Sequence, residues 1–91
     1  MSAVDFKERI HQSDLRLISG RIRRARRTAD LTLDELAEKA GTSRQHLISL
    51  EKARHRPRLE MLTKIAEATG RSVEWFLDPD VDPSPFQEEA A

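Results

Sequence analysis

The feature that most restricts the fold is a pair of short amphipathic helical patterns joined by the tripeptide GTS. Thr32 and Glu35 form a T-x-x-E capping box that starts the first pattern. Gly41 ends it, because glycine accepts the left-handed conformation of a helix C-cap. The second pattern begins after Thr42 or Ser43, which are both suitable N-caps. Two such helices with a short turn between them are typical of a helix-turn-helix.

Side chains within residues 33–50 meet the packing requirements of this motif. Ala37 supplies the small side chain that is needed where the two helices cross closely. Leu47 and Leu50 give the second helix a buried face, while its opposite face is polar and begins at Arg44. Because several independent requirements are met at the correct spacing, the motif is strongly indicated.

The hydrophobic spacing elsewhere also predicts helices, and no segment shows the alternation of a β-strand. The predicted fold class is therefore all-α, with five helices. We expect them over residues 13–29, 33–40, 44–50, 59–69 and 73–77. Residues 4–11 are compatible with a further helical turn or two.

Charge is distributed unevenly, although the formal net charge is zero. Residues 78–91 hold five acids and no base, which leaves 16 basic against 11 acidic side chains, a net of +5, in residues 1–77. A basic domain with an acidic extension is typical of a nucleic-acid binder, although a solvated tail on an ordinary domain explains the segment equally well. We expect an N-terminal extension over residues 1–13, a single domain over 14–78 and an acidic, disordered tail over 79–91.

Several functional classes lack the residues that they need. The chain has no cysteine, and His11, His46 and His55 do not have the spacing of metal ligands, so neither a metal nor a cofactor is expected. We find no catalytic triad, carboxylate pair or phosphate-binding loop, so an enzyme is not expected. No apolar run could span a bilayer and no signal peptide is present, which indicates a cytoplasmic, nucleoid-associated protein without a membrane partner.

The segment IRRARRTADLTLDELAEKAGTSRQHLISLEKARHRPRLEMLTKIAEATGRSVEWFLDP resembles the Cro/repressor-like, XRE-type helix-turn-helix proteins. The resemblance covers residues 17–79, and the ending SVEWFLDP is especially similar to lambdoid phage repressor domains. It implies a lambda-repressor-like fold of five helices whose third helix enters the major groove of double-stranded DNA. The implied function is a sequence-specific transcriptional regulator, expected to be a repressor that binds a palindromic operator as a homodimer.

The resemblance places the base-reading positions on the third helix, at Arg44, Gln45 and Ser49. The chemistry agrees, because arginine binds guanine and glutamine binds adenine through two hydrogen bonds each. Ile48 lies on the same side and would contact a thymine methyl group, or else pack against the rest of the domain.

Contacts to the DNA backbone or the minor groove are expected from a larger set. These residues are Thr32, Ser43, His46, Arg54, Arg56, Arg58 and Arg21. Two positions depart from the family pattern: Leu33 replaces a phosphate-binding glutamine, and Arg58 replaces a serine that caps the fourth helix. The resemblance also implies a structural ion pair between Arg26 and Glu51.

The end of the domain is unusually apolar for a five-residue helix. We expect Trp75 to pack in the core and Val73, Phe76 and Leu77 to form a dimer interface, unless all four are core residues. Two other functions remain open at this stage. An antitoxin would use the same fold with a protein partner bound to the tail at Phe86, and an adaptor would bind proteins and no DNA.

Overall fold

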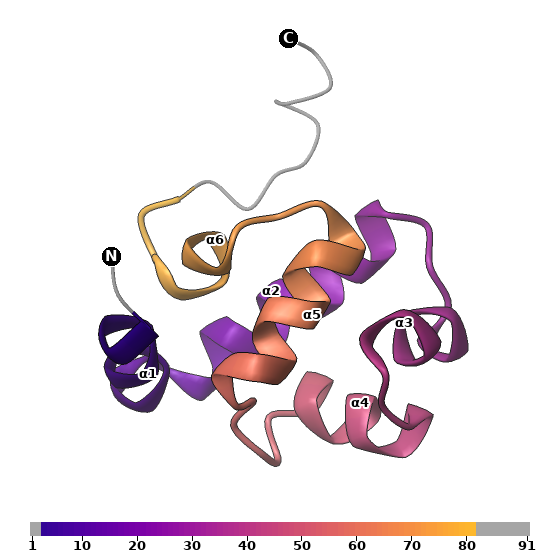
Figure 1. Ribbon diagram of the computed structural model, residues 1–91, viewed down its shortest axis with the longest axis horizontal. Helices are drawn as coiled ribbons and strands as arrows, with labels where there is room; N and C mark the ends of the chain where they lie inside the picture. Colours follow the sequence, from indigo (N-terminus) through magenta and orange to yellow (C-terminus); the bar gives the residue numbers. More distant parts are fainter. Residues whose placement is uncertain (1–2, 82–91) are drawn as a thin grey trace, which may run out of the picture.

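The computed structural model describes the backbone of residues 3–81 and the side chains of residues 5–81. All regular structure in this part of the chain is α-helical, as Figure 1 shows. The helices are α1 (Ala3–Gln12), α2 (Leu15–Thr28), α3 (Leu33–Ala40), α4 (Arg44–Glu51), α5 (Leu59–Thr69) and α6 (Val73–Leu77). None of these helices is long and apolar enough to cross a membrane. Residues 82–91, which include Phe86 and most of the expected tail, lie outside the described residues.

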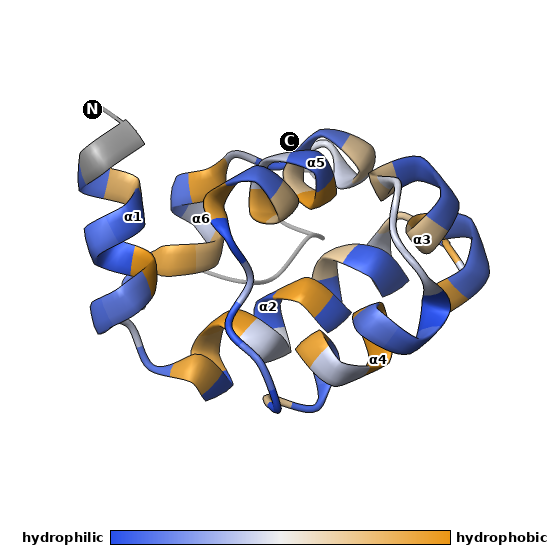
Figure 2. Ribbon diagram, turned by 60° about the horizontal axis from the view of Figure 1, so that its bottom comes forward, coloured by the Kyte–Doolittle hydropathy of each residue, from blue (hydrophilic) through white to orange (hydrophobic). Residues whose placement is uncertain are grey.

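The core lies where the other helices surround α2 and α5, which overlap at the centre of Figure 1. Each helix turns its apolar stripe inward, as the orange segments of Figure 2 indicate. The largest fully buried side chains are Phe76, Ile18, Ile22, Leu36, Leu47, Leu50, Leu62 and Ile65. Since α2, α3, α4, α5 and α6 all contribute to this set, the two helices of the motif are held by one shared core.

The turn between α3 and α4 has the predicted chemistry. Both bonds of the capping box are present, from Thr32 N to Glu35 Oε1 (2.8 Å) and from Glu35 N to Thr32 Oγ1 (3.0 Å). Gly41 has φ of 69°, the left-handed region that favours glycine. Of the two predicted caps for α4, Ser43 is the one used, because its hydroxyl accepts a bond from the His46 amide at 3.0 Å.

The N-terminal region differs from the prediction. The sequence predicts a separate extension over residues 1–13, but α1 packs against α5 and α6, and Ile10 is only 5% exposed. Arg9 also pairs with Glu74 at the edge of α6, at 3.1 Å. Asp14 caps α2, while the Ser13 hydroxyl donates to a carbonyl of α1. Residues 3–13 therefore belong to the same folded unit as the rest of the domain.

Helix α6 is a core element. Trp75 is buried, as predicted, but Phe76 and Leu77 are also buried, at 0% and 3% exposed. The prediction that these two residues form a dimer interface is therefore wrong, because α6 packs across α2 and α5 and turns their side chains into the monomer. Val73 alone of the three predicted interface residues remains partly exposed.

Candidate nucleic-acid interface

Helix α4 has one face in the core and one in solvent. Leu47 and Leu50 are fully buried, which fixes the rotation of the helix about its axis. Arg44 and Gln45, in the first turn, are exposed. Since Ser43 uses its side chain to cap this end of the helix, the cap and the two exposed side chains form one polar tip.

The remaining candidates on α4 are less accessible. Ile48 and Ser49 are both partly buried, which places them at the margin of the exposed face. His46 is also partly buried, and it lines a hollow together with His55 and Met61. The side chains that extend furthest into solvent on α4 are therefore those of its first turn.

An ion pair braces the far end of α4. Arg26 Nε lies 2.6 Å from Glu51 Oε2, and Arg26 Nη2 lies 3.0 Å from Glu51 Oε1, so the guanidinium binds the carboxylate with two bonds. Arg26 also donates from Nη1 to the carbonyl of Leu31, just before α3 begins. One largely buried arginine thus connects α2, the segment before α3 and the end of α4.

A second arginine contacts the same carboxylate, and the sequence reasoning missed it. Arg23 Nε lies 3.8 Å from Glu51 Oε1, and Arg23 Nη2 donates to the Glu51 carbonyl at 3.3 Å. The signal was available, because Arg23 precedes Arg26 by three residues and so lies on the same helix face. Glu51 is only 7% exposed, so its charge depends on these partners.

The exposed tip of α4 also contacts α3. Arg44 Nε lies 3.6 Å from Asp34 Oδ1, with 57% and 78% of the two side chains exposed. The sequence reasoning did not single out Asp34. The contact uses Nε, the guanidinium nitrogen nearest the backbone, and both side chains are largely in solvent.

The start of α3 lies beside this contact. The backbone N–H of Thr32, which donates to the Glu35 carboxylate, and then the Thr32 side chain hold the pKa of Glu35 below its ordinary value, because hydrogen bonding favours the ionised form. The Thr32 oxygen accepts a bond within the capping box, so the hydroxyl proton is the part of this side chain that could bind a phosphate. Leu33, the departure from the family pattern, is partly buried against the core.

Arg21 does not lie at this surface. The sequence predicts that it contacts the DNA backbone, but it is 5% exposed and donates from Nη1 to the Trp75 carbonyl and from Nη2 to the Val81 carbonyl (2.9 Å). Its guanidinium also lies 5.3 Å from the centre of the Trp75 ring. The spacing could have shown this, because Arg21 follows the buried Ile18 by three residues.

The loop after α4 presents three arginines, Arg54, Arg56 and Arg58, all exposed. Arg56 is also anchored, because its Nη1 donates to the carbonyls of Ile10 (2.8 Å) and Ser13 (2.7 Å). Arg58 occupies the N-cap position of α5 without a side-chain capping bond, as its departure from the family pattern predicts. The loop is thus both a basic surface and an attachment point for α1.

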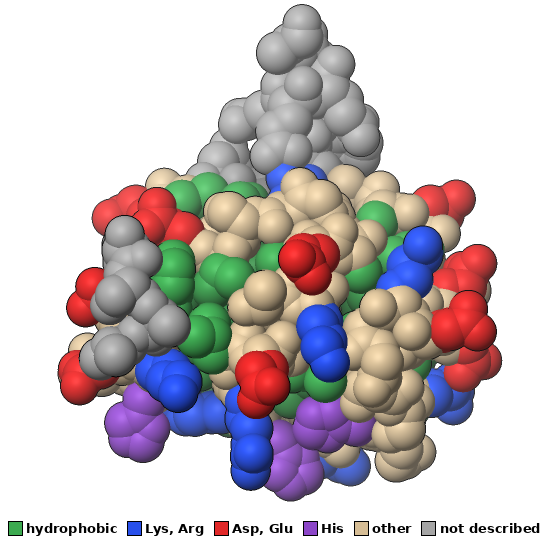
Figure 3. Space-filling model, viewed as in Figure 1, with side chains coloured by type: hydrophobic (Ala, Val, Ile, Leu, Met, Phe, Trp, Pro, Cys, Tyr) green, Lys and Arg blue, Asp and Glu red, His purple; other side chains and the backbone are tan. Residues whose placement is uncertain are grey.

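These features gather on one side of the molecule. In Figure 3 the His side chains and several Lys and Arg side chains lie along the lower edge, where Figure 1 shows α4 and the loop that follows it, while other Lys and Arg side chains lie at the centre and on the right. Most acidic side chains visible in that view lie on the left and right sides instead. Within the part of the chain that the structure describes, no group of three or more His, Cys, Asp or Glu residues could hold a metal ion.

The comparisons with known proteins identify the class. Residues 22–76, more than half of the chain, match the family described as helix-turn-helix. The chain therefore belongs to this family, in the XRE-type class of DNA-binding proteins.

Its relatives include regulators from archaea and bacteria. An HTH-type transcriptional regulator of Methanothermobacter thermautotrophicus is 48% identical over 50 residues, which are 55% of this chain and 72% of the relative. One from Sinorhizobium fredii is 35% identical over 71 residues, 78% of this chain and 91% of the relative. Among solved structures, the clp gene regulator ClgR from Corynebacterium glutamicum is similar, with a TM-score of 0.67 and 32% identity over 69% of this chain and 67% of that one.

Proposed function

We propose that this chain is a transcriptional repressor that binds a palindromic operator as a dimer, with α4 in the major groove. Arg44 and Gln45 read bases, while Ser49 and Ile48 make marginal base contacts. Thr32, Ser43, His46, Arg54, Arg56 and Arg58 bind the backbone, and Arg58 is the candidate for the minor groove. The Thr32 hydroxyl supplies part of the phosphate contact that family members make with the glutamine replaced here by Leu33.

One observation carries this proposal: the exposed first turn of α4 on a helix whose other face is fixed in the core. A recognition helix must keep its angle when it enters the groove, because base readout requires two hydrogen bonds at once. Leu47 and Leu50 set the rotation of α4, and the Arg26–Glu51 pair holds its far end. Arg44 and Gln45 supply the donors and acceptors that pair with guanine and adenine.

The dimer is supported by size. A single small domain buries too little DNA surface for tight specific binding, so such domains usually bind two half-sites about 34 Å apart. The molecule measures 33 × 30 × 21 Å along its principal axes. Two copies that lie side by side along either of the two longer axes would have centres 30 to 33 Å apart, close to the spacing of successive major grooves on one side of the duplex.

The decisive experiment is selection of DNA from a random pool, followed by measurement of single variants on the selected sequence. Arg44→Ala and Gln45→Ala should each relax the preference at one defined base pair by about 1–3 kcal/mol. Arg24→Ala, which removes an exposed cation from α2, is the matched control and should leave base preferences unchanged. Two inverted half-sites in the selected sequence would support the dimer, and reduced transcription from a promoter that contains them would support repression.

The alternatives predict different outcomes. An adaptor predicts that no sequence is enriched and that binding to its partner is insensitive to salt, which would overturn the proposal. An antitoxin would bind DNA and also a toxin through the tail. Because Phe86 lies outside the described residues, the structure adds no support for that function.

A further inference from the structure

Two neighbouring hollows lie between α1 and α4, along the edge that carries the loop arginines. One hollow of about 510 Å³ lies between α1 and the start of α5, and a second of about 450 Å³ lies between the start of α5 and α4. Both hollows are lined by Arg56, Arg58 and Glu60, so they are adjacent. We call them together the basic groove.

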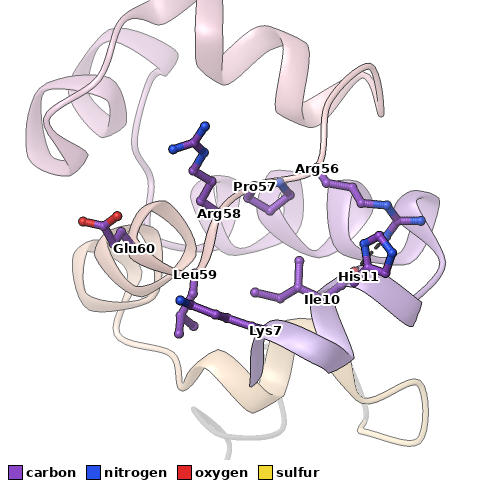
Figure 4. A pocket seen from close by; sticks show the side chains of 8 residues that line it. All are labelled: Lys7, Ile10, His11, Arg56, Pro57, Arg58, Leu59 and Glu60. Carbon is purple, nitrogen blue, oxygen red and sulfur yellow. Dashed lines mark hydrogen bonds between the residues drawn. The ribbon is translucent and has the colours of Figure 1, made fainter. Parts of the chain in front are cut away.

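Helix α1 supplies one wall of this groove. Figure 4 shows Lys7 of α1 extending toward Leu59, and His11 of α1 beside the end of the Arg56 side chain. The two bonds from Arg56 Nη1 to Ile10 and Ser13 hold the C-terminal end of α1 against the loop. Because both bonds use Nη1, the Nε and Nη2 groups of Arg56 remain able to bind another acceptor.

The charge of the groove is strongly one-sided. Lys7, Arg56, Arg58 and Lys64 line it, against the single carboxylate of Glu60. All three histidines of the chain line it as well, His11 in the first hollow and His46 and His55 in the second. Side chains of this kind, arranged in a line along a hollow, are suited to a ligand with successive negative charges.

We propose that the basic groove binds the sugar–phosphate backbone of duplex DNA outside the bases that α4 contacts, which makes α1 part of the DNA-binding surface. This inference rests on the proposed function. The groove begins at His46, one residue after Gln45 on α4, so a backbone strand that leaves the bases read by α4 meets the loop arginines and then Lys7. The sequence predicts residues 1–13 to be an N-terminal extension and assigns them no function.

The test compares the full chain with a Lys7→Gln/His11→Gln double variant on operator duplexes of increasing length. Loss of one phosphate contact at Lys7 should make the slope of log K against log salt shallower by about 0.9 and weaken binding about fivefold on long duplexes. On a duplex trimmed to the bases that α4 contacts, the variant and the parent should bind equally. Base preferences should not change, because backbone contacts carry no sequence information.

Two further variants separate the inference from simpler explanations. Lys7→Arg keeps the charge and should retain the dependence on duplex length. Arg24→Gln removes an exposed cation from α2, and any loss of affinity there should be the same on long and short duplexes. Equal thermal unfolding of all variants would show that the fold is intact.

The outcomes distinguish this inference from the proposed function. If the parent protein binds its operator but the double variant keeps the same salt slope and affinity on long duplexes, Lys7 and His11 do not contact the backbone and α1 is not part of the DNA-binding surface. If the parent protein shows no salt-dependent DNA binding, the proposed function itself is wrong.

Discussion

The guanidinium groups of this protein have different roles according to what surrounds them. Arg21 is buried and satisfies carbonyl groups of the C-terminal segment. Arg26 is largely buried, at 13% exposed for its side chain, and neutralises Glu51. Arg44 is exposed and has a weak, solvated partner in Asp34. Burial and partner geometry, more than residue type, therefore decide which arginines support the fold and which are available to DNA.

At this scale the Arg26–Glu51 pair gives a stability prediction. Arg26→Ala should lower the free energy of unfolding by about 3 kcal/mol, because it leaves the buried carboxylate of Glu51 with only the longer contact to Arg23, at 3.8 Å. Urea denaturation measures this loss. The double variant Arg26→Met/Glu51→Met removes both charges and should recover much of it. A loss below about 1 kcal/mol in the single variant would instead indicate that Arg26 and Glu51 interact as weakly as an exposed ion pair.

Asp34 gives a prediction about specificity. Its carboxylate lies 3.6 Å from Arg44 Nε, so even a solvated contact favours one position of the guanidinium at the tip of α4. Asp34→Asn should lower discrimination at the base that Arg44 reads, by about 1 kcal/mol, while non-specific affinity rises because a negative charge near the phosphates is removed. Binding measurements on matched and mismatched duplexes separate the two effects.

Glu38→Gln is the matched control for Asp34→Asn. It removes one exposed negative charge from the same face of α3, four residues further on. Non-specific affinity should rise and discrimination should be unchanged. If both variants raise affinity and neither alters discrimination, Asp34 acts only through its charge.

At the scale of elements, α5 begins without a side-chain cap. Arg58 occupies the N-cap position, and its long side chain extends into the basic groove instead of bonding to the free amide groups of the first turn. By contrast, the two helices of the helix-turn-helix are capped by side chains, α3 by Thr32 and α4 by Ser43. The first turn of α5 is therefore less stable than it would be with a side-chain cap. At this position the chain has the cation of Arg58, which lines the basic groove.

Arg58→Ser should change stability and binding in opposite directions. A serine at this position can cap α5, so the free energy of unfolding should rise by about 1 kcal/mol. DNA affinity should fall, because a cation of the basic groove is lost. Arg58→Ala is the control: it should lose the same affinity without the gain in stability. A serine variant that is no more stable than the alanine variant would contradict the capping argument.

At the scale of the whole molecule, the two ends of the domain are joined. Helix α1 packs on α5 and α6, and the Arg9–Glu74 pair lies between α1 and α6. The segment after α6 is held at Val81 by Arg21 of α2. Helix α1 therefore packs on the five helices α2 to α6, which correspond to the expected domain. It also forms a wall of the basic groove.

The burial of α6 restricts how two copies can associate. Phe76→Ala should lower the free energy of unfolding by about 3 kcal/mol or more, because it opens a cavity in the monomer core. Val73→Glu should leave the monomer folded, and it should weaken operator binding if the dimer uses the partly exposed side of α6. Denaturation measures the first effect, and sedimentation with operator titration measures the second. Unchanged dimerisation in the Val73 variant would place the interface elsewhere.

The sequence by itself determined the local features of this protein. The capping box at Thr32, the turn at Gly41 and the buried faces of α3 to α5 follow from interactions between residues only a few positions apart, so the fold class and the exposed first turn of α4 could be predicted. Family resemblance added the Arg26–Glu51 pair, which the structure contains.

Only the tertiary structure decided which residues outside α4 belong to the surface. Arg21 meets Trp75 across 54 positions of the chain, and Arg56 meets Ile10 across 46. The burial of Phe76 and the attachment of α1 likewise depend on how α2, α5 and α6 pack. Helical spacing can place an arginine on the inward side of a helix, but it does not show whether a carbonyl group lies there to accept its hydrogen bonds. Its role therefore depends on contacts between distant segments, which helical periodicity and capping patterns do not encode.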